Sequence, residues 1–213
     1  MPFQISEATA CDLKRLFQCQ ALAFGEDPFL EMLYPHETLD ENVARQKDML
    51  DSDGRLVTIK VTETLSQTIV GGAIWRVCED EREHYPDVQV DWYGTQGGQD
   101  RAFAQYVFDA VLNRRRSQIP PRHLLLDICF CHPDYQRQGV GQLLVAWGVK
   151  KPDELRLPAF VEASPTGTRL YERNGFHALE NVSLKNERWP LRPEISYTLM
   201  TRPVLELCVA GSD

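Results

Sequence analysis

The chain has 213 residues, of which 43% are hydrophobic and 25% are charged, and this composition excludes disordered, collagen-like and coiled-coil proteins. Its 31 acidic and 23 basic residues give a formal net charge of −8, which argues against a nucleic-acid binder. No apolar run reaches the ~18 residues of a membrane span, and the first residues lack the pattern of a signal peptide. We therefore expect neither a membrane nor a nucleic acid as partner.

The six cysteines form no CxxC pair. We expect them to be structural free thiols rather than disulfides or metal ligands, and we expect no metal site. This use of cysteine predicts a reducing, cytoplasmic location.

In chain order, hydrophobic periodicity predicts the elements of the first half. They are a strand over 3–5, a helix over 8–24, a short apolar piece over 29–34, a polar helix over 37–50, and a hairpin of strands over 55–63 and 69–77. A polar, irregular stretch over 79–99 precedes a helix over 100–116. That helix ends in the run Arg114-Arg115-Arg116, which we interpret as a solvated last turn that complements the helix dipole.

The second half begins with the best strand of the sequence, HLLLDICFC over 123–131. The elements expected after it are a helix over 138–150, a strand over 158–163, a helix over 167–174, a strand from 175 and a last strand over 195–200. This order predicts a mixed α/β architecture with hairpins rather than a doubly wound sheet. We expect one domain over 1–213, with a core over about 3–202, an insert over about 79–117 and a flexible tail over about 203–213.

A glycine turn after the strand at 123–131 predicts an anion site. It reads Gln136-Arg137-Gln138-Gly139-Val140-Gly141 and opens the next predicted helix. The unpaired N–H groups and the dipole at such a helix start favour a phosphate, and glycine lets the phosphate approach the backbone. The turn has neither the Lys-Ser/Thr of a P-loop nor the G-x-G-x-x-G of a dinucleotide-binding fold. The turn therefore indicates a phosphate or pyrophosphate ligand, although it belongs to neither of these two loop types.

Two motifs carry a resemblance to a known family. The turn at 136–141 resembles the acetyl-CoA pyrophosphate loop of the GCN5-related N-acetyltransferase (GNAT) superfamily. The segment Leu170-Tyr171-Glu172-Arg173-Asn174-Gly175-Phe176 resembles the second signature of that superfamily, L-Y-x-x-x-G-F. Gln136 and Tyr171 lie 35 residues apart (171 − 136), which suits an intervening helix, strand and loop. The resemblance covers residues 3–202, and the wording around the motifs is similar to fungal, small-molecule-type members.

The resemblance implies a fold and a reaction. The fold is an acyl-CoA N-acyltransferase fold, in which a mostly antiparallel central sheet has splayed strands and is flanked by helices. The reaction is the direct attack of an amine on the thioester of acetyl-CoA, the co-substrate, without an acyl-enzyme, so no cysteine nucleophile is required. The acceptor would be a small-molecule amine that the sequence does not identify, and both a monomer and a homodimer are compatible with the sequence.

The resemblance also implies which residues bind acetyl-CoA. The pantetheine arm would pair with the backbone of Cys129, Phe130 and Cys131, where the strand splays from its neighbour. Ser164 stands where many members have an asparagine that binds pantetheine, and its alternative role is a helix N-cap before Pro165. The residues expected around the pyrophosphate are Gln136, Arg137, Gln138, Gly139, Val140, Gly141 and Gln142.

Tyr171 matches the tyrosine that protonates the leaving thiolate, and its alternative role is a buried tyrosine that packs a helix on the sheet. Histone-type members carry a glutamate base where this chain has Leu125. Asp127, two residues further on the same strand face, is the best candidate for the general base. Glu162 on the next strand is the second candidate, and ordered water is a third solution.

Other polar residues keep two interpretations each. Lys150 and Lys151, followed by a proline that ends the helix early, either reach the adenosine phosphate or are solvated. We interpret His132 as a loop residue without a catalytic role. The aromatic and histidine residues of the insert either form the acceptor-side wall or merely cover a sheet edge, and they are His84, Trp92 and Tyr93.

The sequence therefore predicts an acetyl-CoA-dependent N-acetyltransferase that acts on a small amine. One alternative is an enzyme of the same fold whose chemistry has changed, for example to decarboxylation, because a fold does not fix a reaction. A second alternative is a module that senses acyl-CoA or binds a partner without turnover.

Overall fold

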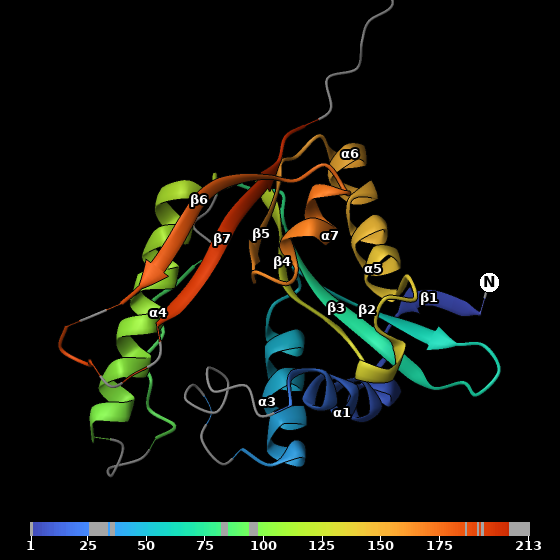
Figure 1. The fold of residues 1–213 in the computed structure, drawn as a ribbon, viewed down its shortest axis with the longest axis horizontal. Helices are drawn as coiled ribbons and strands as arrows, with labels where there is room; N and C mark the ends of the chain where they lie inside the picture. Colours follow the sequence, from blue (N-terminus) through green and yellow to red (C-terminus); the bar gives the residue numbers. More distant parts are fainter. Residues whose placement is uncertain are drawn as a thin grey trace, which may run out of the picture.

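The computed structural model describes residues 2–25, 34, 37–81, 85–93, 98–185, 187–190, 192 and 194–204. Its elements (Figure 1) are β1 (Phe3–Glu7), the 3-10 turn η1 (Ala10–Asp12), α1 (Leu13–Phe24), α3 (Leu39–Ser52), β2 (Leu56–Glu63), β3 (Ile69–Cys78), α4 (Gly98–Gln118), β4 (His123–Cys131), the 3-10 turn η3 (Pro133–Tyr135), α5 (Val140–Gly148), α6 (Lys150–Leu155), β5 (Ala159–Ala163), α7 (Thr168–Glu172), β6 (His177–Leu184) and β7 (Ile195–Arg202).

The described strands form a seven-stranded sheet in the order β1-β2-β3-β4-β5-β7-β6. Neighbouring strands are antiparallel except for β4 and β5, which are parallel and are joined through α5 and α6. The predicted order of elements and the mixed, mostly antiparallel sheet are therefore confirmed.

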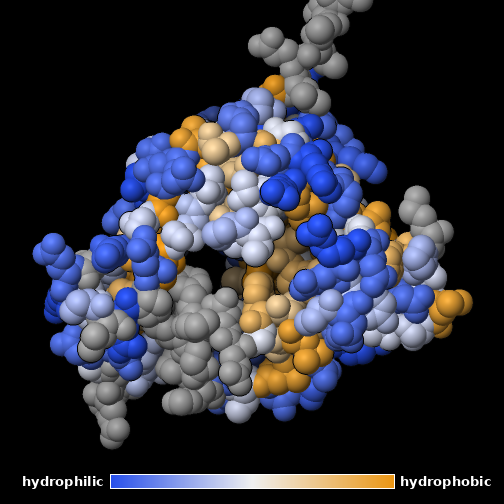
Figure 2. All heavy atoms as spheres, viewed as in Figure 1, coloured by the Kyte–Doolittle hydropathy of each residue, from blue (hydrophilic) through white to orange (hydrophobic). Residues whose placement is uncertain are grey.

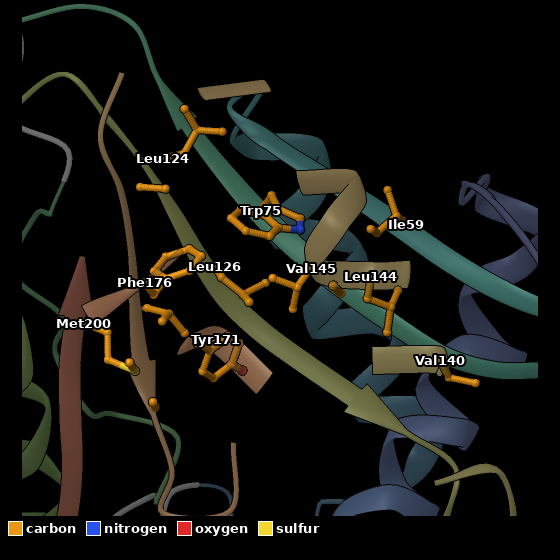
Figure 3. Packing of buried hydrophobic residues seen from close by; sticks show 14 of the residues in the cluster. Ile59, Trp75, Leu124, Leu126, Val140, Leu144, Val145, Tyr171, Phe176 and Met200 are labelled. Atoms are coloured by element: carbon orange, nitrogen blue, oxygen red, sulfur yellow. The ribbon is translucent and has the colours of Figure 1, made fainter. Parts of the chain in front are cut away.

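Alternate residues of β4 bury opposite faces of the sheet, as expected for a strand covered on both sides. Leu124 and Leu126 pack with Trp75 and with α5 in the largest core cluster, which Figure 3 shows from close by. Leu125 faces the other way and packs against Leu112 of α4. The helices α5 and α7 thus cover one face, and α1, α3 and α4 cover the other (Figure 1).

Two glycines bring α5 close to the sheet. A Cβ at Gly148 would lie 2.0 Å from the ring of the buried Trp75 of β3, and a Cβ at Gly71 would lie 2.6 Å from Val140. Such distances leave no room for a side chain, so only glycine allows this approach. The start and the end of α5 are both fixed against β3 in this way, which positions the turn before α5.

The N-terminal helices begin later than the periodicity predicts. The Thr9 and Asp12 side chains form a capping box that creates η1 and delays α1 to Leu13. Thr38 caps α3 with Glu41 in the same way, so α3 begins at Leu39. The predicted helices began at residues 8 and 37, so they wrongly included the capping residues and the residue before each cap.

The predicted helix over 138–150 is two helices. α5 ends at Gly148, and α6 begins at Lys150 with Pro152 in its first turn, where a missing N–H costs little. The expectation that the proline ends the helix at the lysines was therefore wrong. Of the predicted apolar piece over 29–34, all but Tyr34 lies outside the described residues, as do His84, Cys208 and the tail from 205. Within the part described, no helix is long and apolar enough to cross a bilayer.

Candidate active site

The strands β4 and β5 separate half-way along β4. Their pairing runs from Leu124 with Ala159 to Leu126 with Val161, whereas β4 continues to Cys131 and β5 to Ala163. Beyond Leu126, β4 keeps its pairing with β3. The backbone groups of β4 that point toward β5 are therefore open to a ligand with amide groups of its own. This is the splay that the resemblance implies, and it lies at Cys129, Phe130 and Cys131.

A β-bulge marks the point of separation. Trp75 pairs with Leu126 and Ile74 pairs with Ile128, which leaves Asp127 as the extra residue of β4. As a result, Asp127 and Ile128 both face the side of α1 and α4, where Asp127 meets Arg115 and Ile128 packs with the residues of α1. Such bulges re-aim side chains next to ligand sites.

The thiols of Cys129 and Cys131 both lie on the α5 face of the sheet. Burial raises the pKa of Cys129 to about 12 and that of Cys131 to about 11. Both groups are therefore neutral thiols near neutral pH, and the five cysteines of the described residues are free. A neutral thiol is a poor nucleophile, which agrees with a direct reaction that needs no acyl-enzyme.

The glycine turn lies at the end of this gap in an open conformation. Gln136, Arg137, Gln138 and Gly139 are exposed and form the turn before α5, whose first residue is Val140. Gly139 is the N-cap with φ +95°, and no atom lies within 4 Å of a Cβ placed there. The start of α5 is therefore uncrowded at Gly139, and the first N–H groups of a helix are the groups that bind anions.

Side chains connect this turn with the second motif. The carboxamides of Gln142 on α5 and Asn174 after α7 form two hydrogen bonds, Nε2 to Oδ1 at 2.8 Å and Nδ2 to Oε1 at 3.1 Å. Arg202 of β7 donates to the carbonyl of Asn174 at 3.2 Å and pairs with Asp153 of α6. Gln142 is therefore engaged through its side chain, and only its backbone faces the turn. The sequence reading did not identify Asn174 or Arg202 as positioning residues, although Asn174 lies within the recognised motif.

Tyr171 on α7 has the buried packing role that the sequence left open as one alternative, and its role as a proton donor stays a prediction. Its ring is 8% exposed and packs edge-on against Phe176, with ring centroids 6.0 Å apart. The hydroxyl points away from Phe176 and Met200 (Figure 3), and it has no hydrogen-bond partner among the described residues. A Cβ at Gly167 would lie 2.9 Å from the ring, so glycine makes room for it.

The electrostatic environment keeps the Tyr171 phenol protonated. Burial raises the pKa of Tyr171 far above its usual value, and the nearby Cys129 raises it further. A phenol that stays protonated is a proton donor rather than a base. Next to it, Ser164 is exposed and contacts Thr166 Oγ1 at 3.1 Å. The N-cap of α7 is Gly167, so the proposed N-cap role of Ser164 was wrong.

Both carboxylates proposed as general bases are bound to arginines. Asp127 accepts a hydrogen bond from Arg76 Nε at 3.0 Å and one from Arg115 Nη1 at 3.1 Å. Arg115 also donates to both oxygens of Glu162, at 2.9 and 2.6 Å. Arg115 therefore bridges β4 and β5 where they separate. The two acids differ in their access to the cavity on this face of the sheet, because Asp127 lines it and Glu162 does not.

The run of three arginines is not a solvated turn. Burial opposes the charge of Arg115, but Glu162 and Asp127 outweigh it and raise the pKa of the guanidinium. Arg114 pairs with Glu180 at 3.0 Å, and Arg116 donates to the carbonyl of Tyr85 and to Asp87. The interpretation as a solvated last turn was therefore wrong, because this end of α4 lies against the sheet.

A cavity of about 740 Å³ lies on the face of the sheet that carries α1, α3 and α4. Residues at helical spacing line it, and they are Phe17, Gln20, Ala21 and Phe24 of α1 and Asn42, Arg45, Gln46 and Met49 of α3. Asp127 and Ile128 of β4 form its wall next to the gap. Figure 2 shows the surface hollowed in the middle of the view, between the α4 side and the α1 side. Trp92 of the insert lines this cavity, whereas Tyr93 packs in the cluster around Phe103.

Comparison with known proteins matches the segment that holds the gap and the glycine turn. A family model described as acetyltransferase (GNAT) domain matches residues 99–178. The segment over 99–178 of this chain is therefore similar to a GNAT acetyltransferase domain. The match contains β4, the glycine turn, α5, β5 and α7, which are the elements that form the gap. This match and the acyltransferase relative described next support an acyltransferase enzyme.

Relatives extend the likeness to most of the chain. A probable acyltransferase, SID5 of the fungus Ajellomyces capsulatus, is 27% identical over 107 residues, which are 49% of this chain and 68% of the relative. Arylalkylamine N-acetyltransferase 2 of Aedes aegypti has a TM-score of 0.69 at 10% identity, covering 96% of this chain and 100% of that one. A histone acetyltransferase HPA2 and related acetyltransferase of Corynebacterium glutamicum has a TM-score of 0.64 at 16% identity, covering 98% and 100%. At these identities the two structures show the shared fold.

Proposed function

We propose that this protein transfers the acetyl group of acetyl-CoA to a primary amine of a small molecule by direct attack. The observation that carries the proposal is the continuous path along β4. It begins at the open turn around Gly139, follows the unpaired edge of Cys129 to Cys131, and ends beside the unengaged hydroxyl of Tyr171. This path suits an elongated thioester with a diphosphate at one end.

The residues of the path divide the work of binding. The backbone N–H groups of Arg137 to Gln142 would receive the pyrophosphate, and the exposed Arg137 adds a positive charge. The open edge of β4 at Cys129, Phe130 and Cys131 would pair with the amides of pantetheine. Ser164 at the end of β5 offers a hydroxyl on the opposite side of the gap. Lys150 and Lys151 begin α6 and are exposed, so their contact with the adenosine phosphate stays a prediction.

The reaction needs one bond to form and one to break. The neutral amine nitrogen forms a bond to the thioester carbon, the C–S bond breaks, and the thiolate takes the proton of Tyr171. The amine proton passes to Asp127, directly or through water, because Asp127 faces the cavity and the gap. Glu162 does not line the cavity and is therefore the weaker candidate.

Calorimetric titration with acetyl-CoA, with free CoA as comparison, tests the binding half of the proposal. Micromolar binding is the expected result, and absence of binding contradicts the proposed site. Release of free thiol is then followed with a panel of amines. A transferase releases thiol only when an amine is present, a repurposed enzyme converts a substrate without such coupling, and a sensor binds acetyl-CoA without turnover.

The glycine turn gives a sharp control for that titration. Gly139→Glu places a negative group in the open space at the turn, so we expect loss of acetyl-CoA binding. Gly54 lies in an exposed turn, and no atom is within 4 Å of a Cβ placed there. Gly54→Glu is therefore the matched control and should bind as the parent does. Equal affinity of the two variants would show that the turn is not the anion site.

The proposed location is the cytoplasm, on the basis of the free thiols in the described residues. Fractionation of the producing cells with an antibody against the chain tests this, and a signal confined to the culture medium would contradict it.

A further inference from the structure

The cavity beside Asp127 has an unusual balance of charge. The carboxylates in its described wall are Glu37, Asp53 and Asp127, and each of them is paired with an arginine of the same wall. The positive charges of these arginines are therefore engaged as well, because each of the arginines binds at least one of the carboxylates. A ligand with a second ammonium group, or with a phosphate, would have to displace an existing ion pair. The charges therefore favour a ligand whose body is uncharged.

Two glutamines of the wall have unused hydrogen-bonding capacity. Gln20 of α1 and Gln46 of α3 are each 6% exposed, and both line the cavity. Their Oε1 atoms are buried and meet no hydrogen-bond donor in the described part of the chain. Buried polar atoms are normally paired, so two such atoms on facing helices need an explanation. The last side-chain torsion of glutamine is soft, so each oxygen can turn toward a donor inside the cavity.

The remaining wall is aromatic. Tyr34 stacks on Trp92 with ring centroids 5.5 Å apart, and Trp92 meets Phe108 edge-on at 5.6 Å. Phe17 and Phe24 add further rings from α1. Aromatic rings accept the flat faces and the edges of another ring. A volume of about 740 Å³ lies in the range of small-molecule sites.

We propose that this cavity binds the acceptor, and that Gln20 and Gln46 determine its specificity by accepting hydrogen bonds from it. The acceptor class is a primary amine with an uncharged aromatic body that carries at least one hydrogen-bond donor away from the reacting nitrogen. The inference rests on the proposed function. It adds to that function the chemical class of the acceptor and the residues that select it.

Matched amines test the class. The probes are tyramine, 2-phenylethylamine, which lacks only the hydroxyl, and 1,4-diaminobutane, which replaces the ring by a second ammonium group. We expect kcat/KM for tyramine to exceed that for 2-phenylethylamine at least fivefold, and 1,4-diaminobutane to be the poorest acceptor. Preference for 1,4-diaminobutane, or turnover of none of the three, would overturn the proposal.

Variants test the two glutamines. Gln20→Met and Gln46→Met keep the length of the side chain and remove the carboxamide. At least one of them should reduce the preference for tyramine over 2-phenylethylamine to less than twofold. The control is Gln18→Met, on the exposed side of α1, which should keep the preference. An unchanged preference in both cavity variants would overturn the role of the glutamines.

The melting temperature of the variants separates a binding role of the glutamines from a structural role. The cavity variants remove a buried oxygen that lacks a partner, so their melting temperature should equal or exceed that of the parent. A lower melting temperature in both would show that the glutamines stabilise the fold, and would overturn the proposal. Acetyl-CoA calorimetry on the same samples separates the two proposals. Binding without acetylation of any probe contradicts only the acceptor class, whereas no binding contradicts the proposed function itself.

Discussion

The hydroxyl of Tyr171 belongs to a residue that is 8% exposed, lies near Cys129 of β4, and has no hydrogen-bond partner among the described residues. We expect Tyr171→Phe to lower kcat at least about tenfold, since a positioned proton donor contributes roughly this much or more. Acetyl-CoA affinity should change little, because the ring and its packing remain. Tyr106→Phe on α4 is the control, since Tyr106 packs on Trp189 away from the gap. Equal turnover of parent and Tyr171→Phe would remove Tyr171 from the mechanism.

The raised pKa of Tyr171 predicts a pH dependence. Because burial raises this pKa, the phenol keeps its proton through the alkaline range, while the free acceptor amine loses its own near its usual pKa of about 10. The kcat/KM profile should therefore rise toward alkaline pH and show no decline up to about pH 10. A decline that begins near about pH 9 would show that the proton donor titrates there and would contradict this environment for Tyr171.

Asp127 and Glu162 form a second contrast between single residues. Both bind Arg115, but only Asp127 lines the cavity. Asp127→Asn should lower kcat at least about tenfold, whereas Glu162→Gln should lower kcat less than about threefold. The two substitutions keep volume and differ only in position, so each is the control of the other. Equal, small effects would favour ordered water as the proton acceptor.

Single helices and strands show where close packing depends on one position. Gly148 ends α5 against the ring of Trp75, where a Cβ would lie at 2.0 Å. We expect Gly148→Ala to lower the free energy of unfolding by roughly 3 kcal/mol, because the buried ring has no space to move into. Urea unfolding measures this, with Gly54→Ala as the control, since a Cβ there meets nothing within 4 Å. Equal stability of the two variants would contradict the tight contact.

At the scale of elements, the sequence predicted correctly those features that depend on residues close together in the chain. The strand over 123–131 was predicted to the residue because both of its faces are buried and its apolar run is continuous. The helix starts failed at Thr9 and Thr38, where side chains compete for the first backbone groups. The bulge at Asp127 was out of reach, since it depends on the register with β3, a strand about fifty residues earlier in the chain.

The candidate site divides in the same way. The glycine turn and Tyr171 could be proposed from the sequence because each belongs to a short contiguous motif. The pairing of Arg115 was missed because its partners lie 12 and 47 residues away in the sequence. The sequence contained one indication of the cavity glutamines. Gln20 is a polar residue at a position of the buried face of α1, where the other buried residues are apolar.

At the scale of the whole molecule, ion pairs join elements that are distant in sequence. Asp12 of η1 pairs with Lys60 of β2 at 2.5 Å, and Asp53 after α3 binds Arg76 of β3. Burial alone would raise the pKa of Asp12, but hydrogen bonds from Lys60 and Thr9 outweigh it and lower that pKa to about 2. Asp53 is likewise lowered to about 2, against the effect of burial, by Arg55 and Arg76. These carboxylates therefore connect helices to the sheet only while they are ionised.

A folded-state pKa below the unfolded value stabilises the protein above the unfolded pKa of about 3.9, and this stability is lost as the pH falls toward the folded pKa. For Asp12 the shift corresponds to about 2 kcal/mol at neutral pH, since one pKa unit is ~1.4 kcal/mol. Asp12→Asn should therefore be less stable than the parent by about this amount at about pH 7, and the difference should vanish near about pH 2. Urea unfolding across this range measures it. Asp40→Asn is the control, because the pair of Asp40 with Lys14 is exposed and such pairs contribute little. A difference between parent and Asp12→Asn that stays constant with pH would show that the side chain acts through packing rather than through its charge.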